Sequence, residues 1–274
     1  MNGTTSQLLS LITYGNHFLR TGQLTHDYYP DNTAFKFCNK TDFLYLSAAS
    51  GGAAMEEVAA TDPVAWFELI KKDGCRILKA YYHPSKGNPD GTPDHQLAGF
   101  VGGGGTWLIE AIYPSWSDYW APRWVVTHKD DPERRIWSVS YGRTISRSDT
   151  INFCPDIVPV HDTLYDVLIE IKAFAVEHQL SNWANIFNNA IDLLNGSKPA
   201  SNLFGGSVNE NDYDQPALRL LYAAMSSDVF GGMGSWNDLG FEKPEENQRY
   251  GDLSYSLYGH MNRALLSSIN SIEP

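Results

Sequence analysis

Two stretches decide the fold of this 274-residue chain, Trp107-Leu108-Ile109-Glu110-Ala111-Ile112 and Ile136-Trp137-Ser138-Val139-Ser140-Tyr141. In both, apolar and polar residues alternate enough to turn one face of a β-strand toward a core. Further strand candidates lie at 76–82, 96–101 and 123–128. The segments between these runs are too short to carry crossover helices, so neighbouring strands should run in opposite directions. The sequence therefore predicts an antiparallel sheet of about five strands.

A helix is expected before this sheet. Its apolar face would carry Leu8, Leu11, Ile12, Gly15 and Leu19, with Thr4 or Thr5 as N-cap and Gly22 at its end. Short strands are expected at 34–38 and 43–47. Asp62 and Pro63 then have the residue types that cap and start a helix, which should stop near residue 74.

The chain beyond residue 150 has the periodicity of helices. One apolar stripe consists of Leu164, Leu168, Ile171 and Ala175, and a second runs from 183 to 194 behind Ser181 as N-cap. A third helix should start at Asp214 and Pro216, and a fourth should cover 253–269. Because the segment 144–155 is polar and without period, we expect an α+β subdomain at 1–150 and a helical subdomain, a bundle of about four helices, at 151–274.

The charge of the chain narrows the choice of partners. Acidic residues outnumber basic ones by 32 to 20, for a formal net charge of −12. Such a balance repels phosphate backbones and anionic lipid, so we expect neither nucleic acid nor membrane as a direct partner. It suits a basic protein partner, although an acidic surface is also common among proteins without one.

Cysteine usage and the start of the chain point to a cytoplasmic protein. Cys38, Cys75 and Cys154 are far apart, without the spacing of a disulfide framework or of a zinc site. No basic residue precedes the first apolar residues, and no run approaches the ~20 apolar residues of a membrane span. We expect no metal and no cofactor.

Residues 113–124 form an aromatic segment that we expect to be a loop between strands. It holds five aromatic residues among twelve, interleaved with charges, which is the composition of a binding surface. The alternative is that its tryptophans supply the core of the sheet. The partner-binding candidates are Trp116, Asp118, Trp120, Arg123 and Trp124.

A second candidate is the glycine loop at 229–238, between two helical patterns. Its backbone N–H groups could hold a carboxylate or phosphate, or its residues could only cap a helix and close turns. The residues concerned are Gly231, Gly232, Gly234, Ser235, Asn237 and Asp238. The run of four glycines at 102–105 favours a flexible hairpin connection. Neither segment completes a catalytic motif, so the catalytic residues, if there are any, stay unknown.

The C-terminal half resembles uncharacterised bacterial immunity proteins of polymorphic toxin systems. The resemblance covers residues 160–270 and rests on Trp183-Ala184-Asn185, Leu221-Tyr222 and the run Gly231–Asp238. It implies a cytosolic, non-catalytic binding protein that inhibits a toxin. The alternative is a hydrolase or transferase with a pocket between sheet and helices near residues 231–238, completed by a histidine such as His128 or His260. A carbohydrate-binding module is a third reading of the aromatic segment.

Overall fold

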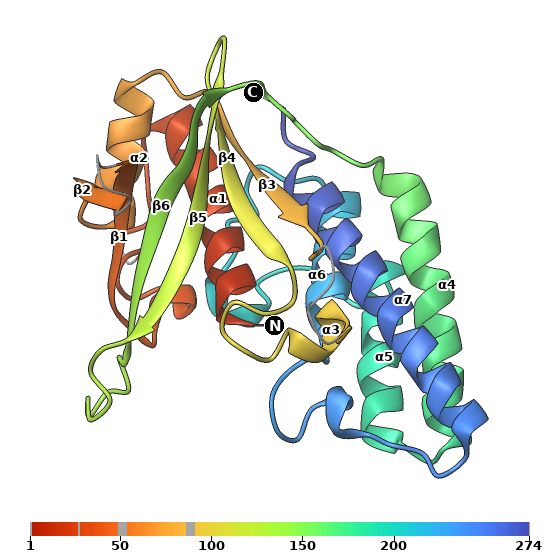
Figure 1. Ribbon diagram of the computed structural model, residues 1–274. Coiled ribbons are helices and arrows are strands. Elements are labelled where there is room, and N and C mark those ends of the chain that lie inside the picture. Colours follow the sequence, from red (N-terminus) through yellow and green to blue (C-terminus); the bar gives the residue numbers. More distant parts are fainter. Residues whose placement is uncertain (1, 27, 49–53, 86–90, 274) are drawn as a thin grey trace.

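The computed structural model describes residues 2–26, 28–48, 54–85 and 91–273. A curved sheet lies beside a helical bundle (Figure 1). The strands are β1 (Cys38–Ala48), β2 (Ala54–Ala60), β3 (Ile77–His83), β4 (Thr106–Ile112), β5 (Ser117–Val126) and β6 (Trp137–Ser148). The α-helices are α1 (Gly3–Thr21), α2 (Pro63–Lys72), α3 (Asp94–Leu97), α4 (Ile157–Glu177), α5 (Ser181–Leu194), α6 (Gln215–Ser226) and α7 (Pro244–Ile269). Short 3₁₀ turns are η1 (Thr33–Phe35), η2 (Phe204–Gly206) and η3 (Trp236–Asp238).

The α+β class is confirmed, but the predicted sheet is wrong in two respects. The six strands lie in the order β2-β1-β6-β5-β4-β3, and β1 runs parallel to β6. All other neighbouring pairs are antiparallel. The parallel pair joins strands that are separated in the chain by four other strands and by α2 and α3, so no short connection in the sequence predicts it.

Two predicted strands have another structure. Residues 33–35 form η1, and β1 begins only at Cys38. Within 96–101 the chain completes α3 and then makes a turn in which the Gly103 N–H donates to the Phe100 carbonyl (3.0 Å). His95 of this short helix and its C-cap residue Ala98 are buried, and their spacing of three residues is that of a helix. Conversely, the strand β2 was not predicted from the sequence.

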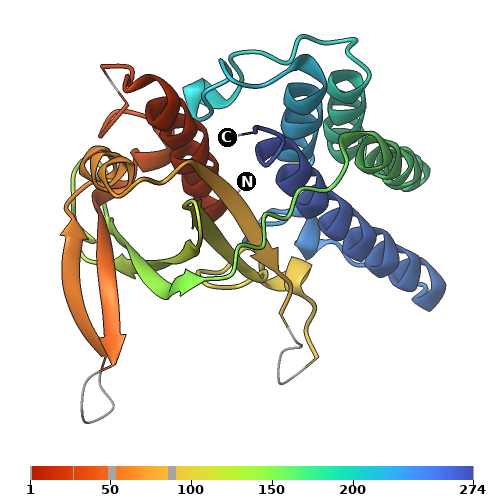
Figure 2. The same ribbon diagram turned by 90° about the horizontal axis from the view of Figure 1, so that it is seen from above.

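Helix α1 lies within the curve of the sheet (Figure 2). It contacts β3, β4 and α2. The predicted end is confirmed, because Gly22 has φ 73° and its N–H donates to the Phe18 carbonyl. The N-cap is instead Asn2, whose Oδ1 accepts a hydrogen bond from the Thr5 N–H (2.9 Å).

The predicted four helices of the C-terminal half are confirmed as α4, α5, α6 and α7. Leu164, Leu168 and Ile171 of the predicted stripe are fully buried. Asp214 caps α6 by accepting from the Ala217 N–H (2.9 Å), whereas α5 begins at Ser181 without a side-chain cap. The periodic apolar stripes therefore locate these helices correctly.

The sheet and the bundle are joined by buried polar contacts. The Lys79 ammonium of β3 donates to the carbonyl oxygens of Asn270 (2.6 Å) and Ile272 (2.7 Å) at the C-terminal end. The Glu110 carboxylate accepts from the N–H groups of Ile151 (2.8 Å) and Asn152 (3.1 Å), in the segment between β6 and α4. The segment that we expected to be a boundary is therefore held against the sheet. The division at residue 150 stays a prediction.

Candidate functional site

A cavity of about 490 Å³ opens beside the N-terminus of α1. Three tryptophans from three strands line it, Trp107 of β4, Trp124 of β5 and Trp137 of β6. We call it the tryptophan cavity. Its remaining lining comes from residues 2–4, 98–103, 105–106 and 121–123. A cavity of this volume with mainly apolar walls has the dimensions of a site for a small molecule or for a few side chains of a partner.

The tryptophans are held by neighbouring aromatic rings and by one glycine. The rings of Trp124 and Trp137 meet edge to face at 5.8 Å, and Trp107 lies 4.8 Å from the Tyr82 ring. A Cβ atom on Gly3 would lie 3.1 Å from Trp124 Cη2. The absence of a side chain at Gly3 therefore lets α1 approach the indole.

The glycine run at 102–105 forms part of the wall for reasons of packing. A Cβ on Gly103 would lie 2.1 Å from the Leu97 carbonyl oxygen, and one on Gly105 would lie 2.6 Å from the Tyr82 hydroxyl. Gly104 has φ 83°, and its carbonyl accepts from the Tyr258 hydroxyl (2.5 Å). The run joins α3 to β4, so it is not the predicted connection between two strands of a hairpin.

A second cavity of about 560 Å³ adjoins the first and shares Asn2, Gly3 and Gly99 with it. Its other walls include Gly231, Gly232 and Ser235 of the glycine loop. A Cβ on Gly99 would lie only 2.3 Å from the Gly231 carbonyl carbon, so the two backbones are in direct contact. The tertiary structure thus brings the end of the aromatic segment and the glycine loop to one surface.

The polar groups of the glycine loop bind one another. The Ser235 hydroxyl donates to the Gly231 carbonyl (3.0 Å) and accepts from the Asn237 N–H (3.3 Å). The Gly234 N–H donates to the Asp238 carboxylate. The Asn237 amide donates to the His95 carbonyl (2.9 Å), which ties the loop to α3. These contacts favour the structural reading of the loop.

The same loop buries Trp236, which is 0% exposed in the core of the bundle. Its indole N–H donates to the Ser254 hydroxyl of α7 (2.8 Å). The rings of Phe187 and Trp183 meet it edge to face at 5.2 Å and 5.6 Å. Gly234, with φ 86°, allows the left-handed turn two residues before this buried side chain.

Residues 113–124 do not form the expected loop, because β5 begins at Ser117. Trp120 is 1% exposed and packs in the core against Phe43 and Trp66. Asp118 is buried and accepts from Arg143 Nη1 (3.2 Å). Trp120 therefore lies in the core of the sheet, which agrees with the alternative prediction that the tryptophans of this segment supply that core.

Of the remaining three candidates of this segment, Trp116 does not line the cavity that Arg123 and Trp124 share. Trp116 stacks on Tyr113 with ring centroids 3.7 Å apart. Arg123 is exposed and forms a two-point ion pair with Glu56 at 2.5 Å and 2.9 Å. Of the five candidate residues, Arg123 and Trp124 line the tryptophan cavity.

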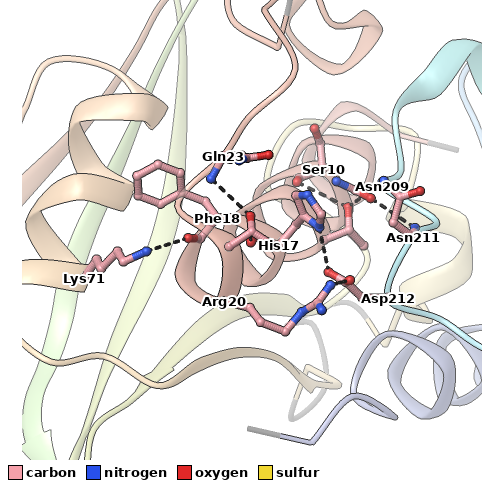
Figure 3. Close-up of polar contacts among 11 residues, drawn as sticks. Ser10, His17, Phe18, Arg20, Gln23, Lys71, Asn209, Asn211 and Asp212 are labelled. Carbon is pink, nitrogen blue, oxygen red and sulfur yellow. Dashed lines mark hydrogen bonds and ion pairs between the residues drawn. The ribbon is translucent and has the colours of Figure 1, made fainter.

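A polar cluster that sequence reasoning missed lies between α1 and the segment 207–214 (Figure 3). His17 Nδ1 lies 3.1 Å from Asp212 Oδ2, and Arg20 forms an ion pair with the same carboxylate. The Asn209 N–H donates to the Thr13 hydroxyl (3.1 Å). Burial, and to a lesser degree Arg20, lowers the pKa of His17. Residues nearly 200 positions apart provide no local signal of this contact.

This cluster borders a third cavity of about 560 Å³, which is lined by Arg20 and Asp212 but not by His17. A general base needs its ring within reach of a substrate, so the histidine is not placed for catalysis there. The cluster holds α1 against the bundle instead.

Two of the thiols lie in the interior. Burial raises the pKa of the Cys38 thiol to about 11 and that of the Cys75 thiol to about 12. A thiol with such a pKa is a poor nucleophile at neutral pH. Among the residues that the structure describes, no group of three His, Cys, Asp or Glu side chains could hold a metal ion.

Comparison with known proteins identifies no relative. No protein-family model matches the chain, and no curated protein and no solved structure is significantly similar to it. The resemblance to immunity proteins therefore stays a prediction. Within the described ranges, no helix has the length and apolarity to cross a bilayer.

Proposed function

We propose that this protein is a non-catalytic binding protein, and that the tryptophan cavity takes up an apolar group of a protein partner. The observation that carries the proposal is the convergence of Trp107, Trp124 and Trp137 on one cavity. Tryptophan is enriched among the residues that dominate the energy of protein interfaces, especially where a pocket excludes water.

The rim of the cavity supports a protein partner over a small molecule alone. Phe100 and Val101, which line the cavity, are 66% and 61% exposed, and Val125 next to Trp124 is 46% exposed. An apolar surface that continues from a cavity onto its rim is typical of protein interaction sites. The partner would cover this rim when it fills the cavity.

The charges of the site support binding over catalysis. Among the described residues that line the tryptophan cavity, Arg123 is the one charged side chain, and Glu56 already pairs with it. A catalytic site needs a titratable group aimed at a substrate. The net charge of −12 would instead speed association with a basic partner, an effect that salt weakens.

An immunity-like inhibitor of a toxin is the specific form of this function that the resemblance of the C-terminal half favours. It is tested by calorimetry of the purified protein with the product of the adjacent open reading frame of its source genome, at two salt concentrations. We expect tight, salt-sensitive binding. No binding would refute the immunity-like form.

Substitution tests the role of the cavity in that complex. Trp124→Ala should weaken binding by at least ~2 kcal/mol, about thirtyfold in Kd. Trp116→Ala is the matched control, because Trp116 stacks on Tyr113 and does not line the cavity. Equal affinities of Trp124→Ala and the wild-type protein, with an intact fold by circular dichroism, would contradict the proposal.

The hydrolase or transferase alternative has one supporting observation. The half-buried Asp228 lines the second cavity, and burial raises the pKa of its carboxyl. A carboxyl of this kind is a candidate general acid. The described hydrogen bonds of Asn237 and Asp238 include neither His128 nor His260. A hydrolase screen that finds an activity abolished by Asp228→Asn would favour the alternative.

A further inference from the structure

The two edges of the sheet differ in whether their outward backbone groups are hydrogen-bonded. At the β3 edge, the side-chain amide of Asn16 accepts from the Leu78 N–H (2.7 Å) and donates to the Leu78 carbonyl (2.9 Å). Asn270 makes the same pair of contacts with Ala80 (2.7 Å and 2.8 Å). Two asparagine amides thus occupy the backbone groups of this edge as a further strand would. Sheet edges are commonly protected from pairing in ways of this kind.

The opposite edge, β2, lacks such protection. Its one strand neighbour is β1, and no hydrogen bond joins its outward backbone groups to any residue that the structure describes. Figure 2 shows the hairpin of β1 and β2 extending away from the bundle. In an antiparallel pair, alternate residues direct their N–H and C=O groups away from the neighbour. These groups are available to another strand.

The side chains of β2 are exposed as well. Met55 is 63% and Val58 is 55% exposed, and Glu56 and Glu57 between them are exposed too. Successive residues of a strand point to opposite faces, so each face of β2 carries one apolar and one acidic side chain. An open edge with exposed apolar residues is a pairing hazard unless pairing is its purpose.

We infer that β2 is a docking edge for an extended, basic segment of a protein partner. The backbone of that segment would extend the sheet beyond β2, which is a common mode of peptide recognition. Glu57 makes no ion pair with any described residue, whereas Arg123 holds Glu56. A lysine or arginine opposite Glu57 would supply the missing counter-charge, and apolar residues would cover Met55 and Val58.

Charge also decides against a second copy of this chain as the occupant. Antiparallel self-pairing centred on β2 would place Glu57 opposite Glu57 of the other copy. Like charges directly opposite each other destabilise a strand pair. A basic segment is favoured by the same charges that repel a second copy.

This inference goes beyond the proposed function, because it concerns a surface that does not contain the tryptophan cavity. The probe that tests it is a short, blocked peptide of alternating valine and lysine. A matched peptide of alternating valine and glutamate tests charge. A version of the first peptide with N-methylated alternate amides tests backbone pairing, since it cannot donate the hydrogen bonds.

We expect the valine–lysine peptide to shift the backbone amide resonances of 54–60 in the full-length protein. The peptide should bind the Trp124→Ala variant with the same affinity as the wild-type protein. The valine–glutamate and N-methylated peptides should not bind. Glu57→Lys should weaken binding about fivefold or more, because it turns an attractive pair into a repulsive one. Glu170→Lys, the same charge change at an exposed position of α4, is the control and should have no effect.

Three results would overturn the inference. The first is no resonance shift in β2 at millimolar valine–lysine peptide. The second is binding of the N-methylated peptide as tight as that of the valine–lysine peptide, or a loss of affinity in Glu170→Lys equal to that in Glu57→Lys. Either would show that binding depends on unspecific attraction of charge and not on backbone pairing at β2. The third is a concentration-dependent shift of the β2 resonances without peptide, which would make a second copy the occupant.

Discussion

Substitution of Gly99 by alanine tests the contact that brings the two candidate segments together. The new methyl group would lie 2.3 Å from the Gly231 carbonyl carbon, 2.4 Å from its oxygen and 2.6 Å from the Gly232 nitrogen. Ordinary van der Waals contacts of a Cβ atom are 3.4–4 Å long. All three atoms belong to the backbone, so no side chain can rotate to make room. The segment at 98–105 and the glycine loop must separate by about 1 Å.

The cost follows from overpacking. An extra methyl group in a well-packed interior costs about 1–3 kcal/mol, and here the displacement also strains the hydrogen bond from the Asn237 amide to the His95 carbonyl. We therefore expect Gly99→Ala to lower the free energy of unfolding by about 2 kcal/mol. Gly232→Ala is the matched control. Its Cβ would meet no heavy atom within 4 Å, and its φ lies outside the left-handed region, so its effect should stay within about 0.5 kcal/mol.

Urea denaturation followed by tryptophan fluorescence and by circular dichroism measures both variants. The midpoint should fall for Gly99→Ala with an unchanged m-value, since the surface exposed on unfolding stays the same. Equal stabilities of Gly99→Ala and Gly232→Ala would show that the two segments are not in contact. The placement of the tryptophan cavity next to the glycine loop would then be wrong as well.

Two further predictions concern buried polar groups. Asn270→Ala leaves the N–H and the carbonyl of Ala80 without their partner and should lower the free energy of unfolding by at least ~2 kcal/mol. Faster hydrogen exchange of the Ala80 amide together with a lower urea midpoint would confirm this. Unchanged protection of that amide would contradict it. Burial lowers the pKa of His95 below its ordinary 6.5. The unfolded chain therefore binds a proton at a higher pH than the folded protein does, and the free energy of unfolding falls as the pH drops below about 6.5. His95→Gln should reduce this fall between about pH 7 and pH 5 in urea titrations, and an identical pH slope in both proteins would count against the buried imidazole.

The candidate site was only partly predictable. The sequence singled out Trp124 and the glycine loop, but it offered no reason to place them together. Trp107 and Trp137 were recognised as residues of strands, and their meeting with Trp124 depends on the order of β4, β5 and β6. The signal that could have raised suspicion is the run of four glycines ahead of β4, because close backbone approach often explains such a run.

The open edge was also outside the reach of sequence reasoning. The strand β2 holds the acidic pair Glu56-Glu57 between small apolar residues, a composition that favours strands only weakly. Whether a strand is central or at an edge depends on which strands pair, and β1 pairs with β6, a strand about 100 residues later in the chain.

Local periodicity was enough to locate α1 and the helices of the bundle, because residues three and four positions apart share a helix face whatever the rest of the chain does. Capping is equally local, and the caps at Asp62 and Asp214 are those expected. The parallel pairing of β1 with β6, the contact of Gly99 with Gly231 and the ion pair of Arg123 with Glu56 join residues far apart in the chain. Such contacts form only when the whole chain folds. The cavity and the open edge that depend on them are therefore decided by the tertiary structure.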